Sequence, residues 1–353
     1  MPSAPRSGQR LGARAPAPVV LHSAPLVLPI SAPPIRDGAV AVRGDKVLQV
    51  GAWAELRACF PVQEERRWTG VIAPGLVDAF QVAPWPGALA HGVTAAAGVM
   101  ADPHDCDPHG GIAYLEVRAT GERAWEDHDR DALITALRET DHPGALGLAL
   151  HTPDPHVLED VAILARTFGL RLLADVDRHS PAFLDEAGAL GPHCHVACGG
   201  PLDPGERKLL RLRRATVAIK PPMLSPGDVL ALLEEGDRIA LGSGAGRTPP
   251  LALARAIRDH ARARGVRTAA LDRTLVEAAT LGGARALGLD TGPGRIGTLG
   301  PGSRADLAIF EARGRGPYAA LLDHGRCVGT VLAGAQAPPS PAPSSRISSR
   351  SRS

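Results

Sequence analysis

Short apolar runs separated by turn-forming residues fill the segment that begins near residue 19. These runs are rich in valine, leucine and alanine, and they cover residues 20–21, 26–28, 39–42 and 46–51. The dipeptides Asp37-Gly38 and Gly44-Asp45 between them are typical of tight turns. The pattern predicts a small antiparallel sheet, followed by a helical turn over residues 52–60.

From residue 146 onward, strand-like apolar runs alternate with amphipathic helical segments. The expected strands are 146–150, 170–176, 193–197, 216–220 and 239–242. The expected helices include one whose apolar face is Val157, Val161, Leu164 and Ala165, and the segments 181–187, 206–213, 225–235, 250–264 and 271–287. Such alternation indicates a parallel α/β barrel.

Residues 80–145 show only one recognisable strand, at 91–97. The pattern therefore contains fewer strands than the eight of a complete barrel, which leaves a shortened or distorted barrel open. Both ends of the chain lack apolar periodicity and are rich in Pro, Ser and Arg. We expect residues 1–17 to be a disordered arm and residues 336–353 a disordered tail.

Composition and charge argue against a nucleic-acid-binding or membrane-spanning protein. The chain has 353 residues, and a net charge of +2 in which arginines are interspersed with acidic residues argues against nucleic acid as a partner. The apolar run 19–30 is interrupted by His22, Pro25 and Pro29, so neither a signal peptide nor a membrane span is expected. The 5 cysteines form no C-x-x-C pair, which favours a reducing, cytoplasmic setting.

Four segments carry a resemblance to one family. Residues 72–82, IAPGLVDAFQV, resemble the "PGLVDAHTH" segment that opens the barrel of the amidohydrolase superfamily. Residues 37–56 and 295–310 resemble the start and the return of the β-sandwich beside that barrel. Residues 277–288 resemble the family's "A-T-x-x-G-A-x-x-L-G" helix, where small residues allow close packing.

The resemblance is to the aminodeoxyfutalosine deaminase and imidazolonepropionase branch. It implies a TIM-like barrel over residues 73–291 and a composite β-sandwich built from residues 18–72 and 292–335. It also implies a hydrolase of non-peptide C–N bonds, of the cyclic amide or deaminase type, in which zinc activates a water molecule.

The same resemblance places the family's metal ligands on this chain, and most are replaced. The two first-strand histidines correspond to Phe80 and Val82, which have no lone pair to offer a metal. A later histidine corresponds to Asp175, and the acidic position after it to Arg178, which cannot act as a base. His195 is the retained histidine, and the final aspartate is Gly244. Asp175 and His195 are thus the only metal-ligand candidates left at the positions that the resemblance marks.

Other polar residues have competing interpretations. His193, Cys194, His195 and Cys198 could form a new metal cluster, completed by His104, Cys106 or His109, but their spacing matches no standard site and we favour incidental strand and loop residues.

Lys220 at a strand end could be a reactive lysine. We favour a lysine that is solvated or paired with a carboxylate. The glycine-rich turn at 242–246 could bind an anion through its backbone, although such turns are common elsewhere.

Two hypotheses for function remain. One is a divergent hydrolase that uses Asp175 and His195 with a weakly held metal. The other is a non-catalytic homologue that binds a small molecule or a partner protein in the old pocket, and the apolar Phe80 favours it. The expected pocket lining is Phe80, Gln81, Val82, Asp175, Arg178, His195 and Gly244. No catalytic residue is assigned, and a homo-oligomer is compatible with the sequence.

Overall fold

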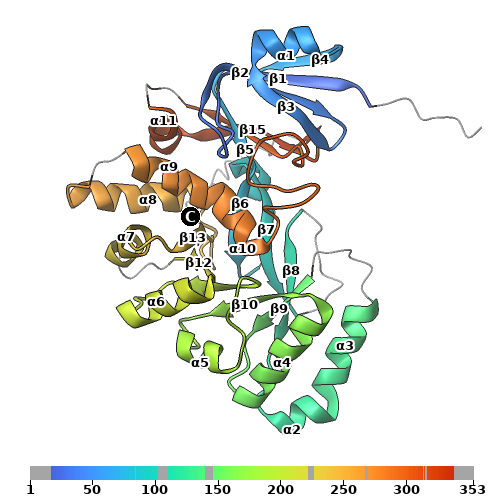
Figure 1. Cartoon of the computed structure of the whole chain (residues 1–353), viewed down its shortest axis with the longest axis vertical. Helices are drawn as coiled ribbons and strands as arrows, with labels where there is room; N and C mark the ends of the chain where they lie inside the picture. Colours follow the sequence, from blue (N-terminus) through green and yellow to red (C-terminus); the bar gives the residue numbers. More distant parts are fainter. Residues whose placement is uncertain are drawn as a thin grey trace, which may run out of the picture.

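A computed structural model describes residues 17–337, except 84, 102–109, 140–145, 222–225, 267–268, 313 and 315. The expected terminal arm and tail therefore lie almost wholly outside the described residues. The described chain forms two eight-stranded sheets, one curled into a barrel and one built from both ends of the chain (Figure 1). None of the described helices has the length and apolar character needed to cross a membrane.

The barrel is parallel and contains eight strands. They are β6 (Leu76–Gln81), β7 (Val93–Met100), β8 (Ile112–Val117), β9 (Leu146–Leu150), β10 (Arg171–Asp175), β11 (Cys194–Cys198), β12 (Thr216–Ile219) and β13 (Arg238–Leu241). Each strand pairs with the next along the chain. The first and last are joined by a bridge between Gln81 and Gly244, whose N–H donates to the Phe80 carbonyl at 3.0 Å. The TIM-like barrel is confirmed, and the shortened form that the sequence left open is not what the structure shows, because both β7 and β8 lie in the segment where only one strand was recognised.

Helices pack around the barrel, and the last of them, over residues 283–287, contributes to its interior core. They are η1 (Ala88–His91), α2 (Glu122–Ala124), η3 (Trp125–Asp129), α3 (Arg130–Glu139), α4 (Pro155–Phe168), α5 (Pro181–Glu186), α6 (Pro204–Arg213), α7 (Pro226–Glu234), α8 (Pro250–Ala263), α9 (Ala269–Glu277), η4 (Ala278–Gly282) and α10 (Gly283–Leu287). Ser180 caps α5 by accepting from the Phe183 N–H. The small residues of 277–288 allow close packing as expected, because a Cβ on Gly283 would lie 2.6 Å from the Val77 Cβ.

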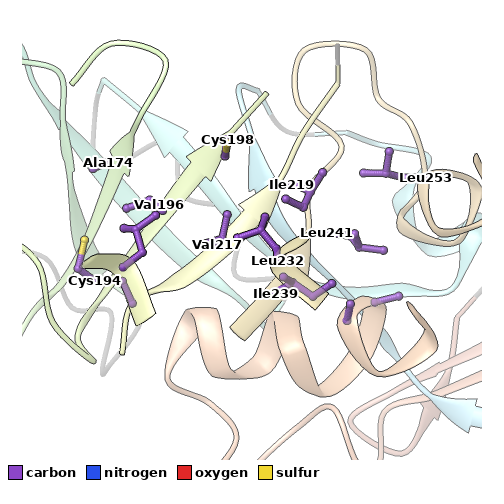
Figure 2. Packing of buried hydrophobic residues seen from close by; sticks show 14 of the residues in the cluster. Ala174, Cys194, Val196, Cys198, Val217, Ile219, Leu232, Ile239, Leu241 and Leu253 are labelled. Atoms are coloured by element: carbon purple, nitrogen blue, oxygen red, sulfur yellow. The ribbon is translucent and has the colours of Figure 1, made fainter. Parts of the chain in front are cut away.

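Alternation along the strands separates two apolar layers. In β11, Cys194, Val196 and Cys198 face the helices, where they pack in one large core with residues such as Leu232 of α7 (Figure 2). Ala197, on the opposite face of the strand, belongs to the core inside the barrel. Because successive strand residues point to opposite faces, the residues that can reach the barrel interior are fixed by this register.

The second sheet is formed by the two ends of the chain. Its strands are β1 (Val19–Val27), β2 (Ile35–Arg43), β3 (Lys46–Ala52), β4 (Val62–Arg67), β5 (Val71–Pro74), β14 (Leu307–Glu311), β15 (Arg326–Leu332) and β16 (Ala335–Gln336). Helices α1 (Trp53–Cys59) and α11 (Pro317–His324) accompany it. The pairing of β14 with β5 makes the sheet composite. The expected antiparallel pairing of the first runs is confirmed, because β2 pairs antiparallel with both β1 and β3. The larger sheet also contains parallel pairs, of β1 with β4 and with β5.

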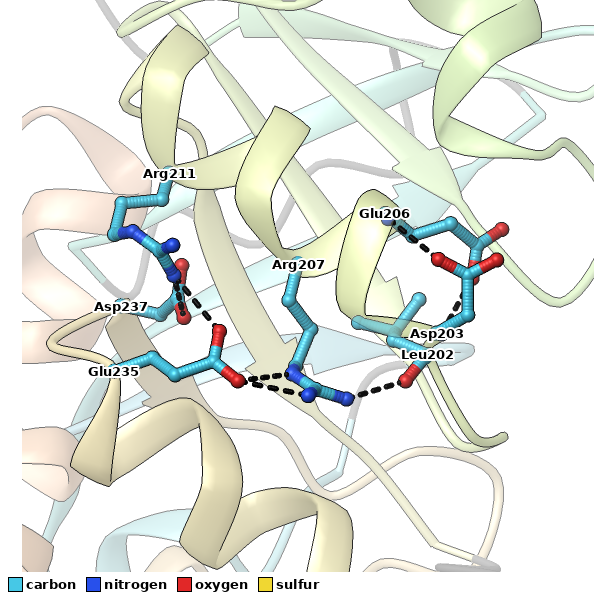
Figure 3. A network of polar contacts seen from close by, with 7 residues as sticks. All are labelled: Leu202, Asp203, Glu206, Arg207, Arg211, Glu235 and Asp237. Atoms are coloured by element: carbon cyan, nitrogen blue, oxygen red, sulfur yellow. Dashed lines mark hydrogen bonds and ion pairs between the residues drawn. The ribbon is translucent and has the colours of Figure 1, made fainter.

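A polar network on the outer wall fixes α6 against the end of α7 (Figure 3). The Arg207 guanidinium donates to Glu235 at 2.7 and 2.9 Å and to the Leu202 carbonyl at 2.7 Å. Arg211 pairs with both Glu235 and Asp237. These contacts position the helices around β11 and β12, whose carboxyl ends contribute to the site described next.

Candidate site at the barrel mouth

Four polar side chains lie at the carboxyl ends of the barrel strands. The barrel core contains Tyr114, Ala149, Leu173 and Ala218, one from each of four strands. Two residues further along each strand, on the same inward face, come Glu116, His151, Asp175 and Lys220. The carboxyl face is where barrel enzymes of this architecture place their sites, so this mouth is the candidate functional site.

Lys220 forms the centre of an ionic cluster at this mouth. Its Nζ lies 3.0 Å from Asp175 Oδ2 and 2.8 Å from Asp177 Oδ2. Burial alone would lower the pKa of Lys220, but the hydrogen bonds that it donates to Asp177 and Asp175 outweigh burial and raise the pKa above its usual value. The lysine is therefore a protonated ammonium at neutral pH and not a nucleophilic amine. The expectation that it pairs with a carboxylate is confirmed.

The Phe80 ring faces this ammonium from the first strand. Lys220 Nζ lies 5.6 Å from the ring centroid, within the range of a cation–π contact. Phe80 is buried, and its neighbour Gln81 donates from Nε2 to Asp78 Oδ2 at 2.9 Å. Val82, one step beyond the strand, is 51% exposed.

Asp78 holds the seam of the barrel. Its carboxylate accepts from the Ser243 N–H at 2.8 Å, across the junction of the first and last strands, and from the Phe80 N–H at 3.3 Å. Burial raises the pKa of Asp78 to about 6, and the bonds from Ser243 and Gln81 oppose that rise. The sequence reasoning did not single out this residue.

Glu116 and His151 form a second polar pair on adjacent strands. His151 Nδ1 contacts Glu116 Oε1, and Arg118 contacts the other carboxylate oxygen. Burial would raise the pKa of Glu116, but Arg118 and His151 outweigh it and lower the pKa. Sequence reasoning missed this pair, although its members stand one at the end of β8 and one directly after β9.

His195 lies deeper in the barrel than Asp175. The strand register pairs Asp175 with Ala197, and Leu173 with His195. The buried ring of His195 contacts the Tyr114 hydroxyl at 3.4 Å and the Ala79 carbonyl at 3.0 Å. Burial, assisted by the charge of Arg171, lowers the pKa of His195 to about 3. The two metal-ligand candidates therefore have separate sets of partners.

The remaining expected site residues are dispersed. Arg178 is exposed, and its backbone N–H donates to the Asp175 carbonyl at 3.0 Å. Gly244 is buried at the seam with a φ of 61°, in the left-handed region. Cys194 and Cys198 face the helices, away from the barrel interior. The candidates His104, Cys106 and His109 lie outside the described residues.

The residues at this mouth do not fit a zinc ion. Phe80 and Gly244 offer no donor, and the ammonium of Lys220 already bonds the Asp175 carboxylate. Across the part of the chain that the structure describes, no three His, Cys, Asp or Glu side chains gather as a metal site. The described charged side chains at the mouth are instead paired with one another, Lys220 with Asp175 and His151 with Glu116.

Comparison with known proteins agrees with this architecture. Residues 171–336 match the model of the amidohydrolase family, and residues 38–61 match the imidazolonepropionase-like composite domain of bacteria. No curated protein matches the sequence.

Solved structures share the fold. An adenosine deaminase from Xanthomonas campestris with bound zinc is 20% identical, with a TM-score of 0.73 over 91% of this chain and 93% of that one. The aminofutalosine deaminase of Helicobacter pylori is 16% identical, with a TM-score of 0.72 over 91% of this chain and 100% of that one. The zinc complex of the atrazine chlorohydrolase TrzN from Arthrobacter aurescens TC1 is 16% identical, with a TM-score of 0.69 over 90% of this chain and 94% of that one.

Proposed function

The chain combines an amidohydrolase-family barrel with an imidazolonepropionase-like composite domain, and we propose that it binds a small polar molecule in the barrel mouth without metal-activated hydrolysis. The general activity of this family is hydrolysis of carbon–nitrogen bonds. The ligand class we infer is a cyclic amide or an amino-substituted ring. This inference rests on the family and on the aromatic and charged side chains that lie together at the mouth.

One observation carries this proposal. The Phe80 ring stands where the family resemblance places a metal-binding histidine, and it faces the Lys220 ammonium at 5.6 Å. A phenyl ring cannot coordinate zinc, whereas it can stack on a planar ligand. The mouth therefore favours recognition of a ring over activation of a water molecule.

The alternative hypothesis of a divergent hydrolase finds less support. It requires Asp175 and His195 to share a metal, yet His195 is one inward position deeper and bonds the Ala79 carbonyl. Its neutral, fully buried ring already has a partner on each nitrogen. Asp175 in turn is bonded to Lys220.

The test combines binding with turnover. Cyclic amides and amino-substituted purine-type rings would be screened by thermal shift and calorimetry, and ammonia release would be followed with and without added zinc. We expect a binder that raises the melting temperature, with no zinc-dependent ammonia release.

Phe80→Leu should weaken that binder by about tenfold, equivalent to about 1.4 kcal/mol, because the aromatic face is lost. Leu212→Ala, at a position that is 69% exposed on α6, is the control and should leave affinity unchanged. Zinc-dependent ammonia release by the wild type would refute the proposal.

A further inference from the structure

Two carboxylates converge on a single ammonium at the barrel mouth. The side chains of Asp175 and Lys220 are only 10% and 13% exposed, and that of Asp177 is 35% exposed. Two acidic groups held this close would repel one another without a cation between them. We propose that the Lys220 ammonium is a resident cation that takes the electrostatic place of a metal ion in this barrel.

The surrounding backbone holds both carboxylates toward the lysine. Asp177 accepts from the Gly200 N–H at 2.9 Å and from the Gly199 N–H at 3.2 Å. Asp175 Oδ1 accepts from the Asp177 N–H at 3.1 Å, which leaves Oδ2 for Lys220. The cluster thus joins the carboxyl ends of three consecutive strands, β10, β11 and β12. Each carboxylate has a fixed donor besides the ammonium, so the cation position is defined by the fold.

The residues around the ammonium suit lysine and not a metal. The Phe80 ring attracts a cation through its face but provides no lone pair. Beyond the end of the last strand, a Cβ added to Gly244 would lie 3.7 Å from the Lys220 Cβ and 3.2 Å from the Pro221 carbonyl oxygen. Gly244 thus lies beside the Lys220 stem and contributes no side-chain ligand to the mouth. Phe80 and Gly244, at two positions where the resemblance places metal ligands, both lie beside Lys220, so lost ligands and a gained ammonium form one arrangement.

Removal of the lysine should create a demand for an external cation. In Lys220→Ala, Asp175 and Asp177 keep their backbone donors but lose their shared positive charge. We expect a lowered melting temperature that methylammonium restores in a saturable manner, because this ion reproduces the lysine head group. Tetramethylammonium at the same concentration cannot donate hydrogen bonds and should not restore it. Zinc should also stabilise this variant and leave the wild type unchanged.

Matched variants separate this effect from ionic strength. Lys46 is also ion-paired, at 3.1 Å from Asp45, but its side chain is 40% exposed, so Lys46→Ala should show no response specific to methylammonium. If Lys220→Ala does not fold by itself, the readout becomes the yield of refolding with each ammonium ion. The triple variant Lys220→Met, Asp175→Asn, Asp177→Asn removes the charges together, and it should fold without any amine response.

All of these experiments measure protein stability. They therefore test the role of Lys220 independently of the ligand that the mouth binds. Specific restoration by methylammonium supports the proposal. An unchanged melting temperature for Lys220→Ala would overturn it, as would equal restoration by tetramethylammonium. A triple variant that fails to fold would also overturn it, because lysine would then be needed for a reason other than charge compensation.

Discussion

Asp78 gives the sharpest quantitative prediction, because it is a fully buried carboxyl at the barrel seam. Its pKa is raised from 3.8 to about 6 in the folded protein. Between these two values the folded chain holds a proton that the unfolded chain has released, so stability decreases as the pH rises through this window. At about 1.36 kcal/mol per unit, the full effect is about 3 kcal/mol, of which about 1.4 kcal/mol falls between pH 5 and pH 8.

The perturbation is Asp78→Asn, which keeps the shape of the side chain and removes its titration. The amide oxygen of Asn can still accept from the Ser243 N–H, while its NH2 group would oppose the Gln81 amide. We expect this lost hydrogen bond to lower the free energy of unfolding by about 1–2 kcal/mol at every pH, in addition to the pH-dependent part. The diagnostic quantity is the difference in unfolding free energy between wild type and variant as a function of pH. This subtraction cancels the titration of all other groups.

The assay is urea denaturation at several pH values from 5 to 8. We expect the advantage of the wild type over Asp78→Asn to shrink by about 1.4 kcal/mol as the pH rises across this range. Asp131→Asn, at an exposed position of α3, controls for the change in net charge. A difference that stays constant with pH, or that grows as the pH rises, would refute the reasoning about Asp78.

Two further predictions concern the seam and the barrel interior. Gly244→Ala should lower the free energy of unfolding in urea by about 1–2 kcal/mol, because φ is 61° there. Gly98→Ala is the control, because a Cβ at that position meets nothing within 4 Å. Equal losses in the two variants would contradict this account. His195 stays neutral in the fold with a pKa of about 3, so below pH 6.5 the unfolded chain gains a proton that the folded chain does not, and stability should fall by about 2 kcal/mol by pH 5. His195→Gln should lose less stability than the wild type as the pH falls to 5. An equal loss in the two proteins, measured by urea denaturation, would contradict this prediction.

Periodicity predicted most of the second half of the barrel. The strand over residues 146–150 coincides with β9, and the apolar face of the following helix is buried as expected. Strand β8 was missed because Ile112–Val117 is apolar on both faces apart from Tyr114 and Glu116, so alternation gives no signal. A strand buried on both sides does not show the period of two that identifies a half-exposed one.

The candidate site was less accessible to sequence reasoning. Asp175 and Lys220 were both noticed, but they stand 45 positions apart, and only the parallel pairing of β10, β11 and β12 brings their side chains together. The depth of His195 likewise depends on a register of two residues, which decides whether a side chain reaches the mouth or the interior. Glu116 and His151 carry no sequence motif that links them.

The most direct test of the central claim is the metal content of the purified full-length protein, expressed with zinc supplied and isolated without chelator or metal resin. If Lys220 takes the place of the metal, inductively coupled plasma mass spectrometry should find a zinc content near zero per chain. A content close to one tightly held metal per chain would contradict the claim.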